Sequence, residues 1–422
     1  MPGANHTLCS AGGPLSITAG SVFVGGGSAS ASAYKWVSGS NNVLSGAEIA
    51  DANAGITFTG GTGLTVNAGT GSLQVSGNWA SAEAYTGVTG SNNNVSGDHA
   101  AIAGADVGFL SGGALSLTAG NISISSFLDP DAYAYRSAGS GSGNSLAGNY
   151  TAVATGNIVL TSAGSMAISA ASGAVAMYAG SAYAQAYDSV SAGDAVSGSS
   201  TAGAASGIVV TAFGSLNLTA DSLYLQGGWA NADTSGVGAN AAAATASTQI
   251  LVGADKTINL TGDLTLQGGN ASTSGNGIAL ANAVLDPGTM NIVTGGNVNL
   301  TGGFVTGNSQ ASAAIQATGP INLTIGGSLN ITGSLALPLL PAPNTPITLI
   351  FTGGGGQNFI VDPSLAPAYI QTFPALISIT MPPEAVVATQ SSNLLADLFA
   401  PLSDTGEGDG GDDEKKKPQS CN

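Results

Sequence analysis

The sequence predicts an all-β fold, a right-handed parallel β-helix that ends in a C-terminal cap and a disordered tail. Three observations predict this fold. The 422 residues include 65 glycines and only 7% charged residues, unlike an ordinary globular domain. Apolar and polar residues alternate in short runs such as Leu216–Thr219, which is typical of strands with one buried face. This pattern recurs along the chain at a spacing typical of repeat architectures.

Residues 1–12 are predicted to be an N-terminal extension. The opening residues MPGANHTLCS have neither the basic start nor the apolar stretch of a signal peptide. No run in the sequence reaches the about 18 apolar residues that a membrane-spanning helix needs. Because nothing else in the sequence is typical of a cytosolic protein, we expect the chain to be a C-terminal part of a longer exported protein.

Residues 13–335 are predicted to form the solenoid body. Each unit has two short alternating strands and a glycine corner, as in Leu216–Thr219 and Leu223–Gln226, which Gly227-Gly228 then follows. The units begin at residues 15, 64, 115, 166, 216, 258 and 298. In several units a third run alternates alanine with larger residues, which predicts a strand with alanine on one face. A β-sandwich, the alternative all-β fold, would not repeat one phrase at a near-constant period.

The unit length predicts the size of this body. A rung of a β-helix takes roughly 20–25 residues, so each unit is expected to form about two rungs. Because stacked strands lie about 4.8 Å apart, about 13–16 rungs would make a rod of roughly 60–75 Å. Each rung would bury its apolar residues against the rungs above and below it.

Residues 336–402 are predicted to form a terminal cap, because prolines at positions 338, 341, 343 and 346 interrupt the repeat. We expect strands at 347–351 and 377–380 and a short helix at 393–399. Solenoids need such a cap to cover their last open rung.

Residues 403–422 are predicted to be a disordered tail. The tail is acidic and glycine-rich up to Glu414 and then carries three lysines and a proline. Cys421 lies at its tip, where we expect it to act as a tether or a disulfide partner.

The repeat phrases GALSLTAGNISI, GSLNLTADSLYLQGG, GNVNLTGG and GGSLNITGS resemble those of the filamentous haemagglutinin family. The cysteine close to the C-terminus also resembles the tails of several such exoproteins. The resemblance implies an adhesin at the cell surface of a Gram-negative bacterium or released from it. It also implies export through an outer-membrane two-partner secretion transporter. The N-terminal secretion domain that this transporter recognises in the family is absent from this sequence.

The composition argues against several other classes of function. Lys35, Arg136 and Lys256 are the only basic residues before the tail, too few to neutralise the phosphates of a nucleic acid. The sequence shows no metal-binding motif and no pattern for a cofactor. We therefore expect no catalytic, metal or cofactor site, and we expect an adhesive rod that mediates attachment to cells or surfaces, aggregation or biofilm formation.

Two alternatives remain at this stage. A polysaccharide lyase or hydrolase on a β-helix would need carboxylates clustered in a lateral groove, and the closest pair is Asp129-Pro130-Asp131, whose proline favours a turn. A passive spacer would display an activity encoded elsewhere.

Several aromatic residues recur in the alanine-rich part of the repeat and are expected to point outward. They are Trp79, Tyr85, Tyr133, Tyr135, Tyr183, Tyr187 and Trp229. An aromatic stripe of this kind is a candidate surface for contact with carbohydrate. The alternative is that these rings pack against the segments that follow them, such as Ala241–Thr248.

Overall fold

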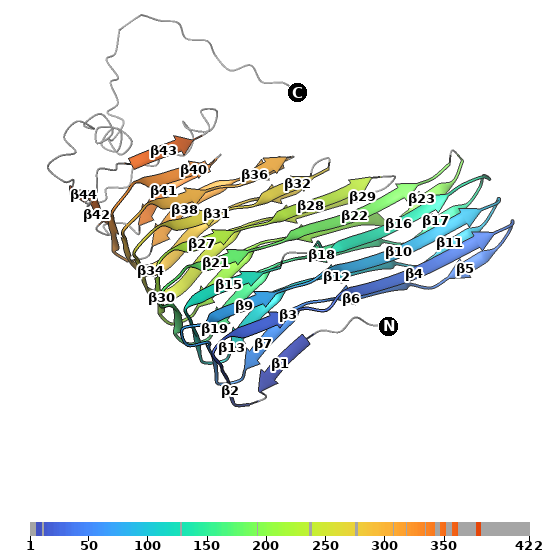
Figure 1. The fold of residues 1–422 in the computed structure, drawn as a ribbon. Coiled ribbons are helices and arrows are strands. Elements are labelled where there is room, and N and C mark those ends of the chain that lie inside the picture. Colours follow the sequence, from blue (N-terminus) through green and yellow to red (C-terminus); the bar gives the residue numbers. More distant parts are fainter. Residues whose placement is uncertain are drawn as a thin grey trace, which may run out of the picture.

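The structure is a computed structural model, and it describes residues 6–10, 12–126, 129–191, 193–235, 239–274, 277–306, 308–317, 319–333, 335–341, 347–351, 357–361 and 377–380. In this part of the chain every regular element is a β-strand. The strands stack into five sheets, here called A to E, in which the paired strands run parallel (Figure 1). The predicted all-β class is confirmed, and the stacked parallel strands are consistent with a solenoid-like fold.

Sheet A has 17 strands and consists of two columns that are joined where β30 and β34 span both. The first column contains β1 (His6–Ser10), β7 (Ile56–Gly60), β13 (Val107–Ser111), β19 (Ile158–Ser162), β25 (Ile208–Ala212), β30 (Thr248–Leu260), β34 (Ala283–Thr294), β38 (Ser312–Ala317) and β41 (Leu335–Pro341). The second column contains β2 (Pro14–Thr18), β8 (Gly63–Asn67), β14 (Ala114–Ala119), β20 (Met166–Ala170), β26 (Leu216–Ala220), β30, β34, β39 (Ile321–Ile325), β42 (Ile347–Phe351) and β44 (Ile377–Thr380).

Sheet B lies next along the chain and has nine strands. They are β3 (Val22–Gly25), β9 (Ser72–Ser76), β15 (Asn121–Ser125), β21 (Val175–Tyr178), β27 (Leu223–Gln226), β31 (Leu264–Gln267), β35 (Val298–Thr301), β40 (Leu329–Gly333) and β43 (Gln357–Val361). Sheets A and B enclose the main core of leucine, isoleucine, valine and phenylalanine side chains. In this core the rings of Phe58 and Phe109, from neighbouring repeats, stack with centroids 4.6 Å apart.

Sheets C, D and E form a second lobe. Sheet C contains β4 (Ala29–Ser38), β10 (Ala80–Thr89), β16 (Asp131–Ala138), β22 (Ser181–Ser189), β28 (Trp229–Ser235), β32 (Asn270–Thr273) and β36 (Phe304–Thr306). Sheet D contains β5 (Val43–Ser45), β11 (Asn94–Ser96), β17 (Ser145–Ala147) and β23 (Ala195–Ser197). Sheet E contains β6 (Glu48–Asn53), β12 (His99–Gly104), β18 (Tyr150–Thr155), β24 (Ser199–Ala205), β29 (Ala239–Thr245), β33 (Ile278–Leu280) and β37 (Asn308–Gln310).

Alanine fills the space between sheets C and E. The inward residues of β10, β16 and β22 are mostly alanines that are fully or almost fully buried, and they meet the inward alanines of sheet E. Such small side chains let the two sheets approach closely. The predicted strand with alanine on one face is therefore confirmed, and the alternating larger residues point outward.

Each repeat forms one level of the stack. One column of sheet A pairs Leu15, Leu64, Leu115, Met166, Leu216, Lys256, Met290, Ile321, Ile347 and Ile377 in succession. The prediction of two rungs for each unit of about 50 residues is therefore wrong, because the alanine-rich part of the unit forms the second lobe of the same level. Ten levels at about 4.8 Å give a stack of roughly 45 Å, shorter than the predicted rod.

The repeats shorten toward the C-terminus. Leu64 and Leu115 are 51 positions apart, whereas Ile321 and Ile347 are 26 positions apart. Among the described strands, sheet D ends at β23, and sheets C and E end at β36 and β37. Figure 1 shows the result as long strands at the blue end of the stack and short strands at the orange end.

The predicted unit starts at 258 and 298 are wrong. Leu216 pairs with Lys256 and not with Ile258. The prediction began the unit at Ile258 because Lys256 occupies a position that is apolar in the other repeats. Val298 pairs with Leu264 of sheet B, so it belongs to a different column from Ile258. Both errors arise where the repeats begin to shorten.

The predicted strands at 347–351 and 377–380 are confirmed as β42 and β44, and both extend sheet A. The predicted helix at 393–399 and the tail at 403–422 with Cys421 lie outside the described residues. At the other end, β1 falls within the predicted extension 1–12 and pairs with β7, so the stacked strands begin before residue 13. The described residues contain no helix that is long and apolar enough to cross a membrane.

Candidate functional site

Four tyrosines form a column on the outer face of sheet C. Tyr34, Tyr85, Tyr135 and Tyr187 are paired in register across β4, β10, β16 and β22. We call them the aromatic column. The rings of Tyr34 and Tyr85 have centroids 6.2 Å apart, and those of Tyr85 and Tyr135 are 4.4 Å apart. The parallel register therefore turns one position of the repeat into a continuous aromatic surface.

One carboxylate organises this column. Glu83 lies one column away and accepts hydrogen bonds from the hydroxyls of Tyr34 and Tyr135, the latter at 3.0 Å. Burial and the hydrogen bond to Glu83 raise the pKa of Tyr135 to about 12, and the hydrogen bond to Glu83 is the main cause of a raised pKa at Tyr34. Both hydroxyls therefore stay protonated at neutral pH and keep their rings in place.

Trp36 widens the same surface. Its indole lies over Gly87, where a Cβ would overlap with the ring, and its centroid is 6.0 Å from that of Tyr85. Trp36 is 59% exposed and Tyr34 is 60% exposed. Neither residue was predicted from the sequence, although the 51-residue distance from Tyr34 to Tyr85 was a usable signal.

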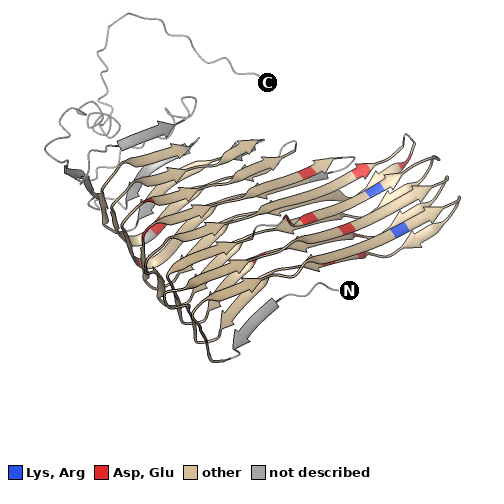
Figure 2. Cartoon of the chain, in the orientation of Figure 1, with Lys and Arg blue, Asp and Glu red and all other residues tan. Residues whose placement is uncertain are grey.

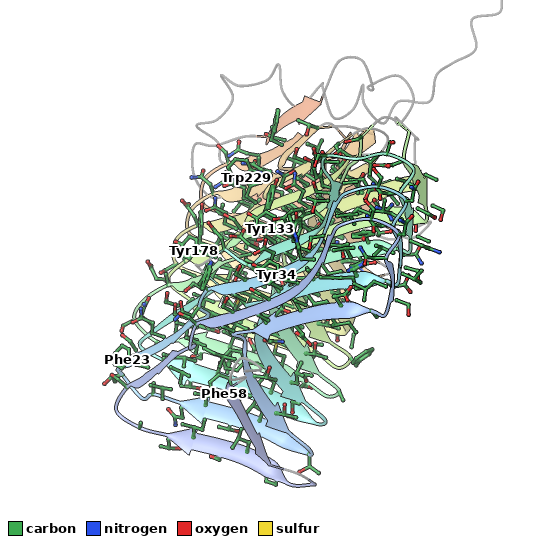
Figure 3. The ribbon with its side chains drawn as sticks, turned by 90° about the vertical axis from the view of Figure 1, so that its right-hand side faces the viewer. Phe23, Tyr34, Phe58, Tyr133, Tyr178 and Trp229 are labelled. Carbon is green, nitrogen blue, oxygen red and sulfur yellow. The ribbon has the colours of Figure 1, made fainter. Side chains whose placement is uncertain are left out.

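The other predicted aromatics occupy the same face outside the column. Tyr133 and Tyr183 are neighbours, with centroids 5.5 Å apart. Trp79 and Trp229 lie near the start of sheet C and are 38% and 56% exposed. Figure 3 shows Tyr34, Tyr133 and Trp229 one above another, at the levels of β4, β16 and β28. The segment Ala241–Thr248, which the alternative names, lies mostly in β29 of sheet E, where Ala242 and Ala244 face the alanines of sheet C, so the rings on the outer face of sheet C do not pack against it.

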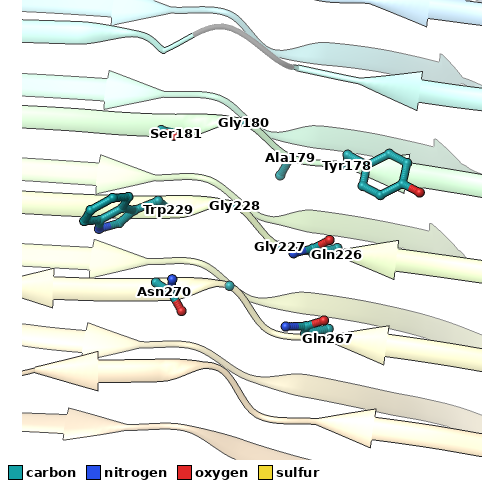
Figure 4. A pocket seen from close by; sticks show the side chains of 11 residues that line it. Tyr178, Ala179, Gly180, Ser181, Gln226, Gly227, Gly228, Trp229, Gln267 and Asn270 are labelled. Carbon is teal, nitrogen blue, oxygen red and sulfur yellow. The ribbon is translucent and has the colours of Figure 1, made fainter.

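A groove of about 370 Å³ lies at the corner between sheets B and C (Figure 4). We call it the corner groove. Its lining side chains carry no formal charge, and none is a carboxylate. The residues that line it are Tyr178, Ala179, Gly180, Ser181, Gln226, Gly227, Gly228, Trp229, Gln267, Gly269 and Asn270.

The floor of the corner groove consists of glycines and Ala179, and glycine is required at two of its positions. A Cβ at Gly228 would overlap with the carbonyl oxygen of Gly180, and a Cβ at Gly269 would overlap with that of Gly228. The same carbonyls hold the chain in place, since the amides of Trp229 and Asn270 donate to Gly180 and Gly228 at 3.1 and 2.8 Å. The close approach of successive corners therefore leaves no side chain to fill the groove.

A buried polar layer crosses the second lobe farther along the strands. It consists of Lys35, Thr86, Arg136 and Asp188 in one column of sheet C and Glu48, His99, Tyr150 and Ser200 in one column of sheet E. Figure 2 shows its basic positions on β4 and β16. Beyond it lies a small apolar cluster that includes Val88, Val95 and Leu146. The layer thus separates two apolar cores.

Arg136 and Asp188 form the best-paired part of this layer. The Arg136 Nε lies 2.6 Å from one carboxylate oxygen of Asp188, and its Nη2 donates to the other at 2.9 Å. The guanidinium also lies 4.4 Å from the ring centroid of Tyr150. Both charged side chains are almost fully buried. The charges are therefore compensated inside the lobe and are not accessible to a substrate.

Glu48 joins two other members of the layer. One of its oxygens lies 2.9 Å from the Lys35 Nζ and the other lies 2.7 Å from the His99 Nδ1. The imidazole stacks on Tyr150 at 4.5 Å. Burial, with the nearby charges of Lys35 and Arg136, lowers the pKa of His99 to about 4. His99 is therefore neutral at physiological pH.

The polar layer was not predicted from the sequence, because its members lie far apart in the chain. The spacing of Lys35, Thr86, Arg136 and Asp188 near the repeat length was the available signal. Asp131 begins β16, and burial and the adjacent charge of Asp129 raise its pKa. In the described part of the chain no group of three or more His, Cys, Asp or Glu side chains is placed to hold a metal ion.

Comparison of the chain with models of protein families, with curated proteins and with solved structures finds no match in any of the three. The resemblance to the filamentous haemagglutinins therefore stays a prediction. The aromatic column and the corner groove are the surface features from which a function can be inferred.

Proposed function

We propose that this chain is the structural rod of an adhesin that resembles the filamentous haemagglutinins and folds as a right-handed parallel β-helix. In this proposal it leaves a Gram-negative cell through an outer-membrane two-partner secretion transporter. At the cell surface or after release it binds glycans or proteins of host or bacterial surfaces and promotes aggregation or biofilm. It has no enzymatic activity of its own.

The aromatic column is the observation that supports attachment. Tyr34, Tyr85, Tyr135 and Tyr187 present their rings at every level of the first four repeats, on a rigid sheet. Exposed aromatic side chains have a large contact area and lose little conformational entropy on binding. Because the body carries few charges, contact through rings and hydroxyls is the mode of binding that its outer surface favours.

Attachment through this face can be tested with beads that carry the purified chain. We expect the double variant Tyr85→Ser, Tyr135→Ser to attach severalfold less to bacterial or epithelial cell layers, because it interrupts the column at two adjacent levels. The matched control is Ile102→Ser, which removes a 39% exposed apolar residue from sheet E on the opposite face.

Circular dichroism and thermal unfolding would verify that both variants fold. Equal attachment by the double variant, the control and the unchanged chain would reject the aromatic column as the attachment surface.

A further inference from the structure

We propose that the corner groove is a binding site for an uncharged, extended oligosaccharide. The inference rests on the proposed attachment function for its biological role, and it names one class of ligand and one site outside the aromatic column. Three features carry it: the arrangement of the two walls, the chemistry of the lining side chains, and the size of the groove.

The two walls follow the stack in register. On the sheet B side, Tyr178, Gln226 and Gln267 occupy paired positions of β21, β27 and β31. On the sheet C side, Ser181, Trp229 and Asn270 occupy paired positions of β22, β28 and β32 (Figure 4). Each level therefore offers one side chain from each wall, and levels repeat at about 4.8 Å. A linear ligand with one ring at each level matches this geometry.

The lining chemistry matches hydroxyl groups. Each amide of Gln226, Gln267 and Asn270 presents both a donor and an acceptor, as a sugar hydroxyl does. The Tyr224 hydroxyl donates to Gln226 Oε1 at 2.9 Å, which leaves the amide nitrogen of Gln226 as a donor. The Tyr224 and Tyr178 rings have centroids 5.3 Å apart, so the sheet B wall is held in place by packing.

Trp229 supplies the apolar platform of the site. Its indole is 56% exposed on the sheet C wall, opposite the amides of Gln226 and Gln267. An amphipathic ring of this kind favours a ligand with one apolar face and polar edges, as a sugar ring has. Because the lining holds no basic side chain, an acidic sugar would gain no ion pair there.

The size of the groove is also suitable. Its volume of about 370 Å³ lies in the range of about 300–1,000 Å³ that is typical of small-molecule sites. The lining comes from three successive levels of the stack, so the groove has room along the stack for about three sugar rings (Figure 4).

The test is a titration of the intact chain with cellotriose and with triacetylchitotriose, followed by tryptophan fluorescence and calorimetry. We expect at least one of them to bind and trigalacturonate to bind more weakly. Trp229→Ala is expected to weaken binding about fivefold to tenfold, and Gln267→Leu to weaken it through loss of the amide at nearly constant volume. Phe23→Ala is the matched control, because Phe23 is 67% exposed on β3 of sheet B, outside both the groove and the aromatic column.

Three results would overturn the inference: no binding of either neutral trisaccharide at millimolar concentration, stronger binding of trigalacturonate, or equal effects of Trp229→Ala and Phe23→Ala. The bead assay separates this inference from the proposed function. If the unchanged chain binds neither neutral trisaccharide but its beads attach to cells, only the groove inference is rejected. If the unchanged chain binds a trisaccharide but its beads do not attach to cells, only the proposed attachment function is rejected.

Discussion

Lys256 is a basic residue that lies buried among apolar side chains. It is 1% exposed and lies between Leu216 and Met290 in an apolar column of sheet A. The hydrogen bond that its Nζ donates, to the carbonyl of Ile250, is long, at 3.5 Å. Burial lowers the pKa of Lys256 to about 7, although the charge of Asp286 acts in the opposite direction. A lysine at this position therefore gives a lower free energy of unfolding than an apolar residue of similar size would give.

Replacing this lysine should stabilise the protein. The pKa of Lys256 is lower in the folded chain than the value of 10.5 in an unfolded one, so the folded state binds fewer protons between about pH 7 and pH 10.5. Stability therefore rises with pH through this window in the unchanged chain. We expect Lys256→Met to raise the free energy of unfolding by about 2–5 kcal/mol at pH 7 and to abolish this rise.

Urea unfolding at pH 7 and pH 10 would measure both effects. The control is Lys35→Met, in which the removed charge is paired with Glu48 at 2.9 Å, so that this variant should be destabilised. A destabilised Lys256→Met variant would mean that the buried ammonium has compensating partners.

At the scale of elements, the polar layer determines how sheets C and E meet. The alanines on one side of it are interchangeable in shape, so they specify the register of the two sheets only weakly. The contacts of Glu48 with Lys35 and His99, and of Arg136 with Asp188, join defined positions. Breaking one partner of a buried pair typically costs about 3–5 kcal/mol, which penalises a shifted register.

His99 makes this layer sensitive to acid. Its folded pKa of about 4 lies below the ordinary value of 6.5 for a histidine, so the stability that the neutral ring contributes is fully present above about pH 6.5 and is lost as the pH falls toward 4. The charges around the ring are Glu48, Lys35, Arg136 and Asp98. We expect the unchanged chain to lose up to about 3 kcal/mol more over this range than His99→Phe, which keeps a ring on Tyr150 but cannot titrate.

Thermal unfolding between pH 7.5 and pH 4 would measure this difference. Tyr150→Phe is the matched control, because it keeps His99 and the stacked rings and should keep the pH dependence. If His99→Phe and the unchanged chain lose stability in parallel, the carboxylates and not the imidazole carry the acid response.

The strands of one column of sheet A and of sheets B and C could be predicted from the sequence, but the strands of the other column, those of sheets D and E, and the strand partners could not. Alternation in Leu216–Ala220 identifies a strand because each strand buries one face, and the alanine-rich runs identified sheet C for the same reason. Alternation does not say how much chain separates two paired strands, so the number of levels was overestimated. Lys256 interrupts the apolar pattern at its position, and the predicted unit start therefore moved to Ile258.

The candidate site could be predicted only in part, for the same reason. Outward aromatics such as Tyr85 and Tyr135 follow from alternation within one strand. The corner groove depends on three levels at once, and Tyr178 and Gln267 have no distinguishing local signal. The polar layer required knowledge that positions such as 48 and 99 are paired across the stack.

At the scale of the whole molecule, the stack is a series of levels that contact their neighbours. Each level buries its apolar residues against the next, and inner strands such as β13 pair on both sides with β7 and β19. Among the described strands, β4 pairs only with β10 and β6 only with β12. Stability in such a stack is approximately a sum over levels and their interfaces, so we expect it to be lowest at the ends.

Hydrogen exchange on the full chain can test this neighbour-by-neighbour organisation with one core substitution. Phe109 is fully buried and stacks on Phe58 at 4.6 Å, so Phe109→Ala should cost about 3–5 kcal/mol locally. We expect faster exchange in β7, β13 and β19 and little change in β35 and β40, several levels away. Phe304→Ala, at a side chain that is 67% exposed, should leave exchange unchanged. Equal acceleration in every sheet A strand would instead mean that the levels unfold as one cooperative unit, and that the short C-terminal levels draw their stability from the wide N-terminal ones.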